Sequence, residues 1–563
     1  MVWSVRSLRQ LFWFALITGC GARTALISSD SASFAAGGSA SGAGGSGGLA
    51  SAGHGAGGTR SNIAGSGGAS AGQTGGGSAG VSGGSAGASG GACSCAANAR
   101  CCGANENCLP NTCVCLDPTL VRTLPANARP SVKASENIGA IFSCPPDPEQ
   151  PLSKLLRVTG NFAGPLPANF PLSMQPDQLL IVPIPPDPIR EQAFFPGELI
   201  TGFIATGLGG PYQWQFNAAV RPKSSGKFSD TGQSLTAAMD AQLADLDHDG
   251  DLDLVTGAAP DHVERVWSND GRGHFSVSAK LPTFGAPLLG DIDQDGDVDI
   301  VSDHLYLNDG LFQFREGAAL GEVHALFDAD GDGDLDVLVV QTPYRQVLLK
   351  NDGTGQFVGV TLGQGAIFDA QSGDLDNDGD LDLVLLTLST TTPAVYSGTV
   401  LLNDGKGGFS ALDAGLMVDA SRSIALGDVD GDGDLDVLMG SWGAAGARNP
   451  SNQVWQNDGS AHFTAGDTPL SGSVQVLLAD LDGDGDLDAL IGRHPPYSVV
   501  AGEPSQVLLN DGRGRFTPSV TLGGSNFHHV ALGDLDGDGD LDAVIAQWSF
   551  TATPTMQVWL QDG

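Results

Sequence analysis

The chain has 563 residues and a mass of 57.3 kDa, enough for about three or four domains. It carries 26 Lys and Arg against 64 Asp and Glu, so its formal net charge is −38 at pH 7. Such a negative field repels the phosphates of nucleic acids and anionic lipids and attracts cations. The composition therefore argues against a nucleic-acid partner and favours metal ions.

The N-terminal residues are typical of an exported chain. Arg6 and Arg9 precede an apolar run that is too short to span a bilayer. The run ends in Ile17-Thr18-Gly19-Cys20, which resembles a bacterial lipobox, where the cysteine becomes the acylated first residue of a lipoprotein. We expect a signal peptide over 1–19, a lipid on Cys20 as the only membrane contact, and a location in the outer membrane or at the cell surface. A plain secretory signal and a secreted protein are the alternative.

Two segments of unusual composition follow. Residues 20–92 are rich in Gly, Ser and Ala and cannot bury enough apolar surface to offset backbone entropy, which predicts a disordered tether. Seven cysteines then fall within 93–116, and an eighth is Cys144. In an exported chain this even number predicts a disulfide-rich module over 93–116, with its connectivity open. A zinc site is the alternative, although paired C-x-x-C arms and a nearby His are missing.

Residues 117–222 have dense prolines and short apolar runs between turn signals, without a sustained helical period. This pattern predicts a β-sandwich. The layout of Glu136-Asn137-Ile138, Gly197-Glu198-Leu199 and Tyr212-Gln213-Trp214-Gln215-Phe216 resembles the bacterial immunoglobulin-like domains that precede propellers in surface proteins. We therefore expect an immunoglobulin-like β-sandwich here.

From about residue 225 one unit recurs seven times. Its centre is D-x-D-x-D-G-D-x-D, and the first Asp of successive copies is 37 to 54 residues apart. Short apolar strands precede and follow the motif, a third strand ends in a turn such as Asn457-Asp458-Gly459, and a fourth opens with a phenylalanine such as Phe463. Four antiparallel strands in each unit, repeated radially, predict the blades of a β-propeller over 223–563.

The two ends of the repeat region complement each other. The seventh unit reaches Gly563 without a fourth strand, whereas Gly226-Lys227-Phe228, ahead of the first unit, has the pattern of one. We expect this strand to complete the seventh blade, because ring closure removes an exposed strand edge.

With these motifs, residues 225–563 resemble FG-GAP/VCBS repeats, the family that builds the propeller of integrin α-subunits. The resemblance implies that the bound cations stabilise the hairpins and take no part in catalysis. The predicted fold is therefore all-β: a seven-bladed β-propeller preceded by a β-sandwich and a small disulfide-rich module.

Each motif places five carboxylates within nine residues, and these repel one another unless a cation binds among them. The pattern follows the logic of a shortened EF-hand loop: side chains at positions 1, 3 and 5 converge, Gly at position 6 permits the turn, position 7 offers its carbonyl, and the last acid closes the shell. Ca²⁺ suits such a flexible oxygen shell better than Mg²⁺ does. The predicted Ca²⁺ ligands, in loops 1 to 7, are Asp245, Asp247, Asp249, Asp251 and Asp253; Asp291, Asp293, Asp295, Asp297 and Asp299; Asp328, Asp330, Asp332, Asp334 and Asp336; Asp374, Asp376, Asp378, Asp380 and Asp382; Asp428, Asp430, Asp432, Asp434 and Asp436; Asp480, Asp482, Asp484, Asp486 and Asp488; Asp534, Asp536, Asp538, Asp540 and Asp542. A ligand-bridging or catalytic cation and a metal-free acidic turn are the alternatives.

Catalytic signatures are missing from the sequence. No H-E-x-x-H, P-loop or nucleotide fingerprint occurs, so we predict no enzyme activity. His528-His529 lies on a predicted strand, which points the two rings to opposite sides and disfavours a metal pair, and His248 at position 4 of loop 1 is expected to be exposed. Six tryptophans could stack on sugars, although such residues more often lie in blade cores: Trp214, Trp267, Trp442, Trp455, Trp548 and Trp559.

These features predict a non-catalytic, monomeric, calcium-stabilised extracellular binding or adhesion scaffold on a bacterial surface, with an unidentified protein or glycan ligand. The alternative is a secreted carbohydrate-binding or carbohydrate-active protein that uses the propeller face. An enzyme should show an acid or His cluster that breaks the repeat, whereas the seven loops are nearly interchangeable. The loops favour the scaffold, and the fold alone does not decide.

Overall fold

A computed structural model of the chain describes residues 99–101, 113–115 and most of 120–561. Within the last range it leaves out 134–137, 143–155, 166–171, 176–177, 182–193, 205–210, 223, 225, 237, 258–260, 284, 389–395, 417–420, 442–450, 467–469, 474, 494–503, 523–526 and 548–554. Every regular element in the described residues is a β-strand, which confirms the predicted all-β class, and no helix there is long and apolar enough to cross a membrane. The predicted signal peptide, Cys20, the tether and Cys144 lie outside the described residues.

The cysteine-rich segment contains one short antiparallel pair, β1 (Ala99–Cys101) and β2 (Cys113–Cys115). Ala99 lies opposite Cys115, and Cys101 lies opposite Cys113. The pairing brings two parts of the cysteine cluster side by side. The disulfides expected there remain a prediction.

Residues 120–218 form two sheets, with strand orders β4-β11-β10-β6-β7 and β3-β5-β9-β8. All pairings are antiparallel except that of β4 with β11. The strands are β3 (Leu120–Leu124), β4 (Arg129–Val132), β5 (Ile138–Phe142), β6 (Leu156–Gly160), β7 (Gly164–Pro165), β8 (Leu172–Gln175), β9 (Gln178–Ile181), β10 (Leu199–Ile204) and β11 (Tyr212–Ala218).

Side chains from both sheets share one buried core. Ile138 and Phe142 of β5 belong to the same cluster as Ile200 of β10 and Trp214 and Phe216 of β11. Burying each such side chain contributes about 1.5–3 kcal/mol. We call residues 120–222 the two-sheet unit; its assignment as an immunoglobulin-like domain remains a prediction.

The described part of the repeat region forms seven sheets, which we number 1 to 7 after the loop that each contains, and in sheets 1 to 6 the four strands paired in order are consecutive in the chain. Sheet 5 has β33 as an additional partner of β31, and sheet 7 has the order β12-β40-β39-β38. The strands of sheets 1 to 4 are β13 (Asp240–Ala244), β14 (Asp253–Gly257), β15 (Glu264–Ser268), β16 (Ser276–Leu281), β17 (Leu288–Gly290), β18 (Asp299–Val301), β19 (His304–Leu307), β20 (Arg315–Ala319), β21 (Glu322–Phe327), β22 (Asp336–Gln341), β23 (Arg345–Asn351), β24 (Phe357–Gln364), β25 (Ala366–Gly373), β26 (Asp382–Leu388), β27 (Tyr396–Leu402) and β28 (Ser410–Leu412). Those of sheets 5 to 7 are β29 (Ser421–Gly427), β30 (Asp436–Ser441), β31 (Ser451–Asn457), β32 (Phe463–Ala465), β33 (Leu470–Ser471), β34 (Gln475–Ala479), β35 (Asp488–Gly492), β36 (Ser505–Leu509), β37 (Thr517–Leu522), β38 (Phe527–Gly533), β39 (Asp542–Gln547), β40 (Thr555–Gln561) and β12 (Phe228–Thr236).

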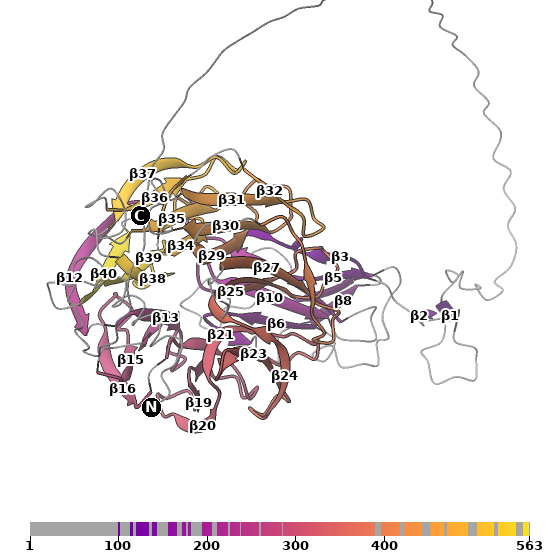
Figure 1. The fold of residues 1–563 in the computed structure, drawn as a ribbon, viewed down its shortest axis with the longest axis horizontal. Coiled ribbons are helices and arrows are strands. Elements are labelled where there is room, and N and C mark those ends of the chain that lie inside the picture. The colour runs from indigo at the N-terminus through magenta and orange to yellow at the C-terminus, as the bar shows by residue number, and fades with distance from the viewer. Residues whose placement is uncertain are drawn as a thin grey trace, which may run out of the picture. The chain divides into compact units, whose positions relative to one another are not determined.

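The sheets are arranged around a common centre (Figure 1). Neighbouring sheets contact one another in chain order, and β38 of sheet 7 also contacts β13 of sheet 1. Sheet 7 contains both ends of the repeat region, because β12 pairs antiparallel with β40, with Phe228 opposite Gln561 and Thr236 opposite Thr555. This pairing confirms the predicted closure by the strand that contains Phe228, and it covers the edge of β40.

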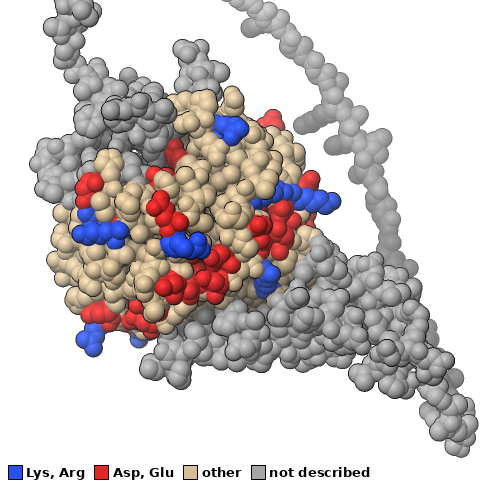
Figure 2. All heavy atoms as spheres, turned by 90° about the horizontal axis from the view of Figure 1, so that it is seen from below, with Lys and Arg blue, Asp and Glu red and all other residues tan. Residues whose placement is uncertain are grey.

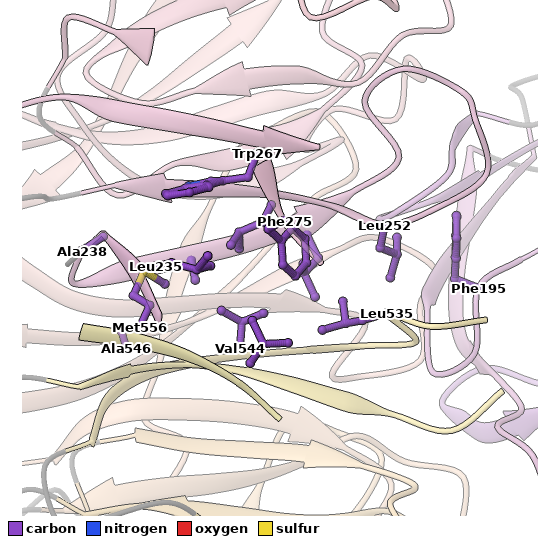
Figure 3. Close-up of a cluster of buried hydrophobic side chains, with 14 residues drawn as sticks. Phe195, Leu235, Ala238, Leu252, Trp267, Phe275, Leu535, Val544, Ala546 and Met556 are labelled. Carbon is purple, nitrogen blue, oxygen red and sulfur yellow. The ribbon is translucent and has the colours of Figure 1, made fainter. Parts of the chain in front are cut away.

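A buried hydrophobic cluster fills the junction between sheets 1 and 7 (Figure 3). It contains Trp267 and Phe275 from the side of sheet 1 and Val544 and Met556 from sheet 7. Phe195 of the two-sheet unit belongs to the same cluster. The closure is therefore supported by side-chain packing as well as by strand pairing.

Candidate metal centres

Each loop connects the first and second strands of its sheet, and apolar residues anchor it in the core. Position 2 is buried in all seven loops, as Leu246 and Leu535 show, and Leu252 and Leu541 at position 8 are buried as well. Gly at position 6 has a positive φ between 91° and 101° in every loop. Because an L side chain rarely adopts this backbone conformation, the glycine is required for the turn.

Backbone N–H groups hold the carboxylates inside each loop. In six loops the glycine at position 6 donates to the carboxylate at position 1, at N–O distances of 2.9–3.2 Å. In all seven loops the N–H at position 7 donates to the carboxylate at position 5, at 2.9–3.0 Å. The protein backbone thus preorganises the acidic side chains.

The Asp at position 9 is buried and joins two backbone segments. Asp253 accepts the N–H of Leu246 at position 2 and the N–H of Asn269 in the turn after the third strand, both at 3.0 Å. The equivalent two bonds occur in the other six loops. Burial raises the pKa of this carboxyl to about 7 or 8 in every loop, and the two N–H bonds offset the shift only in part. Position 9 therefore ties the loop to the neighbouring turn.

Carboxylate oxygens gather within each loop, and several have no protein partner. In the groups Asp291, Asp293 and Asp295 of loop 2 and Asp374, Asp376 and Asp382 of loop 4, one carboxylate oxygen from each residue lies within 4.8 Å of the other two. Among the described residues, a buried Oδ1 without a hydrogen bond recurs at position 1 of loops 2 and 6 and at position 3 of loops 2 to 5: Asp291, Asp480, Asp293, Asp330, Asp376 and Asp430. Leaving such oxygens unpaired costs free energy, and an all-oxygen donor set suits a hard divalent cation. The residues therefore fit the predicted Ca²⁺, and these groups could hold a metal ion.

Burial is the main cause of the high pKa at position 1, and the other acids of the same loop add to it. The pKa rises to about 7 at Asp328 and to about 8 at Asp374. Both causes disfavour the charged form in the metal-free loop. Figure 2 shows acidic clusters with single Lys and Arg side chains among them, in keeping with the net charge of −38.

The carboxylate at position 7 lies against the turn that follows the third strand. A Cβ on Gly512 would come within 2.5 Å of Asp486 Oδ2, so the turn needs glycine there.

Two side chains at position 4 also reach position 7 of the next loop. The Nδ1 atom of His248, which is exposed as expected, lies 3.3 Å from Asp297 Oδ1, and Asn377 Nδ2 donates to Asp434 Oδ1 at 2.7 Å. Neighbouring loops are thereby linked directly.

The asparagine of the Asn-Asp-Gly turn has a role beyond the predicted turn formation. Asn403 Nδ2 donates to the carbonyl of Leu381 in its own loop at 3.0 Å and to that of Ala329 in the preceding loop at 2.8 Å. Every sheet makes the equivalent bond to the preceding loop, through Asn269, Asn308, Asn351, Asn457, Asn510 and, in sheet 7, Gln561. The recurrence of asparagine at the end of the third strand in sheets 1 to 6 was the available signal in the sequence.

The histidines and tryptophans considered in the sequence analysis lie mostly in hydrophobic cores or at contacts between sheets. His529 Nε2 lies 3.4 Å from Asp240 Oδ1 and links sheet 7 to sheet 1, whereas the side chain of His528 is outside the described residues. Trp214, Trp267 and Trp455 are buried, and Trp559 is packed against a core, so the first three cannot stack on a sugar at the surface. Trp442 and Trp548 are outside the described residues.

Comparison with known proteins identifies the repeat. The family model described as FG-GAP-like repeat matches residues 245–302, 328–385, 374–439 and 497–545. Three of these matches begin at position 1 of a loop. The chain therefore carries FG-GAP-like repeats, on sheets arranged as in a β-propeller.

Two solved structures are similar to part of the chain. Both are described as BBS1N in complex with ARL6DN, in crystals soaked with mercury or with lead. They share 10% and 11% identity with this chain, cover 61% of it and 98% of their own chains, and give TM-scores of 0.39 and 0.38. No curated protein matches the chain.

Proposed function

We propose that the chain is a calcium-stabilised, non-catalytic extracellular scaffold that binds a protein or glycan ligand. The observation that carries this proposal is the recurrence of buried carboxylate oxygens without a protein partner at positions 1 and 3 of the loops. The FG-GAP-like repeats support it, since the matched segments contain six of the seven loops, all but loop 6. The similarity of the loops to one another supports a structural role for them, because a catalytic centre needs one distinct site.

In each loop the side chains at positions 1, 3, 5 and 9 and the carbonyl at position 7 would hold the cation. A bound divalent cation would neutralise carboxylates that otherwise repel one another. The chain supplies the rest of the rigidity: position 9 ties each loop to a turn, and the turn asparagines join neighbouring sheets. A rigid ring of this kind can present a constant surface to a ligand.

The proposed ligand binding is tested on arrays of proteins and glycans, probed with the full chain in millimolar CaCl₂ and again in excess EGTA. We expect specific binding in calcium that disappears after chelation. Retention of the same ligand in both buffers would contradict a calcium-stabilised scaffold, and turnover of a glycan on the array would contradict a non-catalytic one.

The proposed surface anchor is tested separately. If Cys20 is acylated, Cys20→Ser should move the protein from the membrane fraction to the soluble exported fraction. Unchanged membrane partition of this variant would exclude Cys20 as the anchor.

A further inference from the structure

The two-sheet unit contacts the face of the ring that carries the metal loops. At three loops the carbonyl of the glycine at position 6 accepts a hydrogen bond from this unit, at 2.7–2.9 Å. The donors are Arg157 Nη1 to Gly333 in loop 3, Gln213 N to Gly379 in loop 4, and Arg221 N to Gly539 in loop 7. Because the same atom of the motif is used each time, the contact depends on the shape that the loops share.

The unit also contacts residues that are predicted to bind the cation. Gln213 Nε2 donates to the carbonyl of Asp328 at 2.9 Å, and Asn127 Nδ2 donates to Asp374 Oδ2 at 3.3 Å. The N–H of Asp245 donates to the carbonyl of Phe162 at 3.1 Å. These aspartates occupy position 1 of loops 3, 4 and 1. A displacement of position 1 would therefore displace the interface.

The packing at position 6 leaves no room for a side chain where the unit is in contact. A Cβ on Gly379 would lie 2.0 Å from the ring of Tyr212, and one on Gly333 would lie 2.6 Å from Arg157. Gly433 of loop 5 has the same backbone conformation, yet a Cβ there would meet no atom of the described residues within 4 Å. Loop 5 therefore offers an internal control for loop 4.

Charge attraction makes a smaller contribution than these contacts. Arg157 and Arg221 each lie 3.8 Å from a loop carboxylate, Asp334 and Asp538, and their side chains are 43% and 53% exposed. Ion pairs this exposed are screened by water and contribute little. The hydrogen bonds to the loop backbone and the close contacts at the glycines therefore make the larger contribution to holding the two-sheet unit on the ring. Both require the loops to keep one conformation.

We propose that this interface is a cation-dependent latch: a divalent cation in the loops holds the two-sheet unit on the ring, and loss of the cation releases it. In metal-free loops the closely spaced carboxylates repel one another, so the loops relax and the carbonyls at position 6 move away from their donors. Linkage is reciprocal, so docking must also raise the cation affinity of the loops it contacts. The latch rests on the proposed calcium sites.

Hydrogen exchange of the full chain, resolved to single residues by mass spectrometry, tests the latch. The N–H groups of Gln213 and Arg221 bond to loop carbonyls, whereas that of Ala218 bonds to Glu198 within the two-sheet unit at 2.9 Å. Chelation with EGTA should speed exchange at Gln213 and Arg221 by about tenfold, a common size for coupling between sites, and leave Ala218 unchanged. Unchanged rates at Gln213 and Arg221 would overturn the latch.

A matched pair of variants keeps the test decisive if chelation unfolds the whole chain, which would speed exchange at Ala218 too. Asp376→Asn removes the charge at position 3 of loop 4, which contacts the unit, and Asp430→Asn makes the same change in loop 5. With calcium present, Gln213 should exchange faster in Asp376→Asn than in Asp430→Asn, while Ala218 exchanges equally in both. Equal rates at Gln213 in the two variants would contradict the latch.

A calcium titration of the unaltered chain by calorimetry separates the two proposals. If the chain binds Ca²⁺ and the exchange rates do not respond, the latch is wrong and the calcium sites stand. If the chain binds no Ca²⁺, the proposed function fails and the latch fails with it.

Discussion

At the scale of single residues, the carboxylates of one motif have different roles. Position 9 is buried and accepts two backbone N–H bonds, as at Asp488, where both distances are close to 3 Å. At position 3, by contrast, one carboxylate oxygen accepts no hydrogen bond within the described residues, as Oδ1 of Asp376 and of Asp430 shows. Position 9 therefore ties the loop to the turn in addition to its place in the proposed ligand set, whereas position 3 has an oxygen that no protein group uses.

The buried carboxyls predict an unusual pH dependence for the calcium-free chain. Position 9 has a pKa of about 7 or 8 in the fold, as at Asp253 and Asp382, and Glu198 has a pKa of about 7, against about 4 for an unfolded acid. The folded state thus holds more protons between these values, so this contribution to stability is complete below about pH 4 and is lost as pH rises towards 8.

We therefore expect the calcium-free chain to melt at a higher temperature at about pH 5.5 than at about pH 8, measured by calorimetry in buffers stripped with a chelating resin. Saturating Ca²⁺ should weaken or reverse this trend, because a cation binds the ionised carboxylates. A melting temperature that rises with pH in the calcium-free chain would show that these carboxyls are charged in the fold.

The turn asparagines give a second prediction at this scale. Asn457 Nδ2 bonds to the carbonyls of Leu375 and Leu435, so Asn457→Ala leaves buried groups unpaired and should lower the free energy of unfolding by about 1–3 kcal/mol. The control is Asp458→Ala in the same turn, where only an exposed bond to the N–H of Ser460 is lost, with an expected cost within about 0.5 kcal/mol. Thermal unfolding in saturating calcium compares the two, and equal costs would refute the inter-sheet role.

At the scale of elements, the strand β12 determines whether sheet 7 is complete. It is far in sequence from β40, yet the two strands pair from Phe228 to Thr236 and complete sheet 7. Leu235 also belongs to the hydrophobic cluster between sheets 1 and 7. Loss of β12 would expose the edge of β40 and part of this cluster together.

Two truncated chains isolate the contribution of β12. A chain of residues 224–563 retains β12 and lacks the two-sheet unit, whereas a chain of residues 237–563 lacks both. We expect the shorter chain to aggregate and to unfold less cooperatively, because an unpaired strand edge templates association. Light scattering and thermal unfolding measure the difference, and a soluble 237–563 chain that melts like 224–563 would show that closure by β12 is dispensable.

At the scale of the whole molecule, the repeated sheets and the closure of the ring could be predicted from sequence, whereas the contacts between the two-sheet unit and the ring could not. The seven acidic motifs predict the seven sheets, because strand periodicity and turn residues are local properties of the sequence. The fragment Gly226-Lys227-Phe228 predicts the closing strand, because it has the pattern of the fourth strand that the last repeat lacks. The bond from Gln213 to Gly379 has no such signature, since it depends on the packing of two separate parts of the chain. Trp214 is likewise recognised as a core residue only once both sheets of its unit are assembled.

Calorimetry of the full chain in about 10 mM CaCl₂ and in excess EGTA tests the central claim most directly. Extracellular calcium modules bind at roughly 10⁻⁴–10⁻³ M, so tenfold saturation adds about 1.4 kcal/mol at each site by mass action. Seven independent sites would add on the order of 10 kcal/mol, which corresponds to a rise in melting temperature on the order of 10–15 °C for a ring of this size. We predict that chelation lowers the melting temperature of the ring by this amount. Identical melting curves in the two buffers would contradict the assignment of these loops as calcium sites of structural weight.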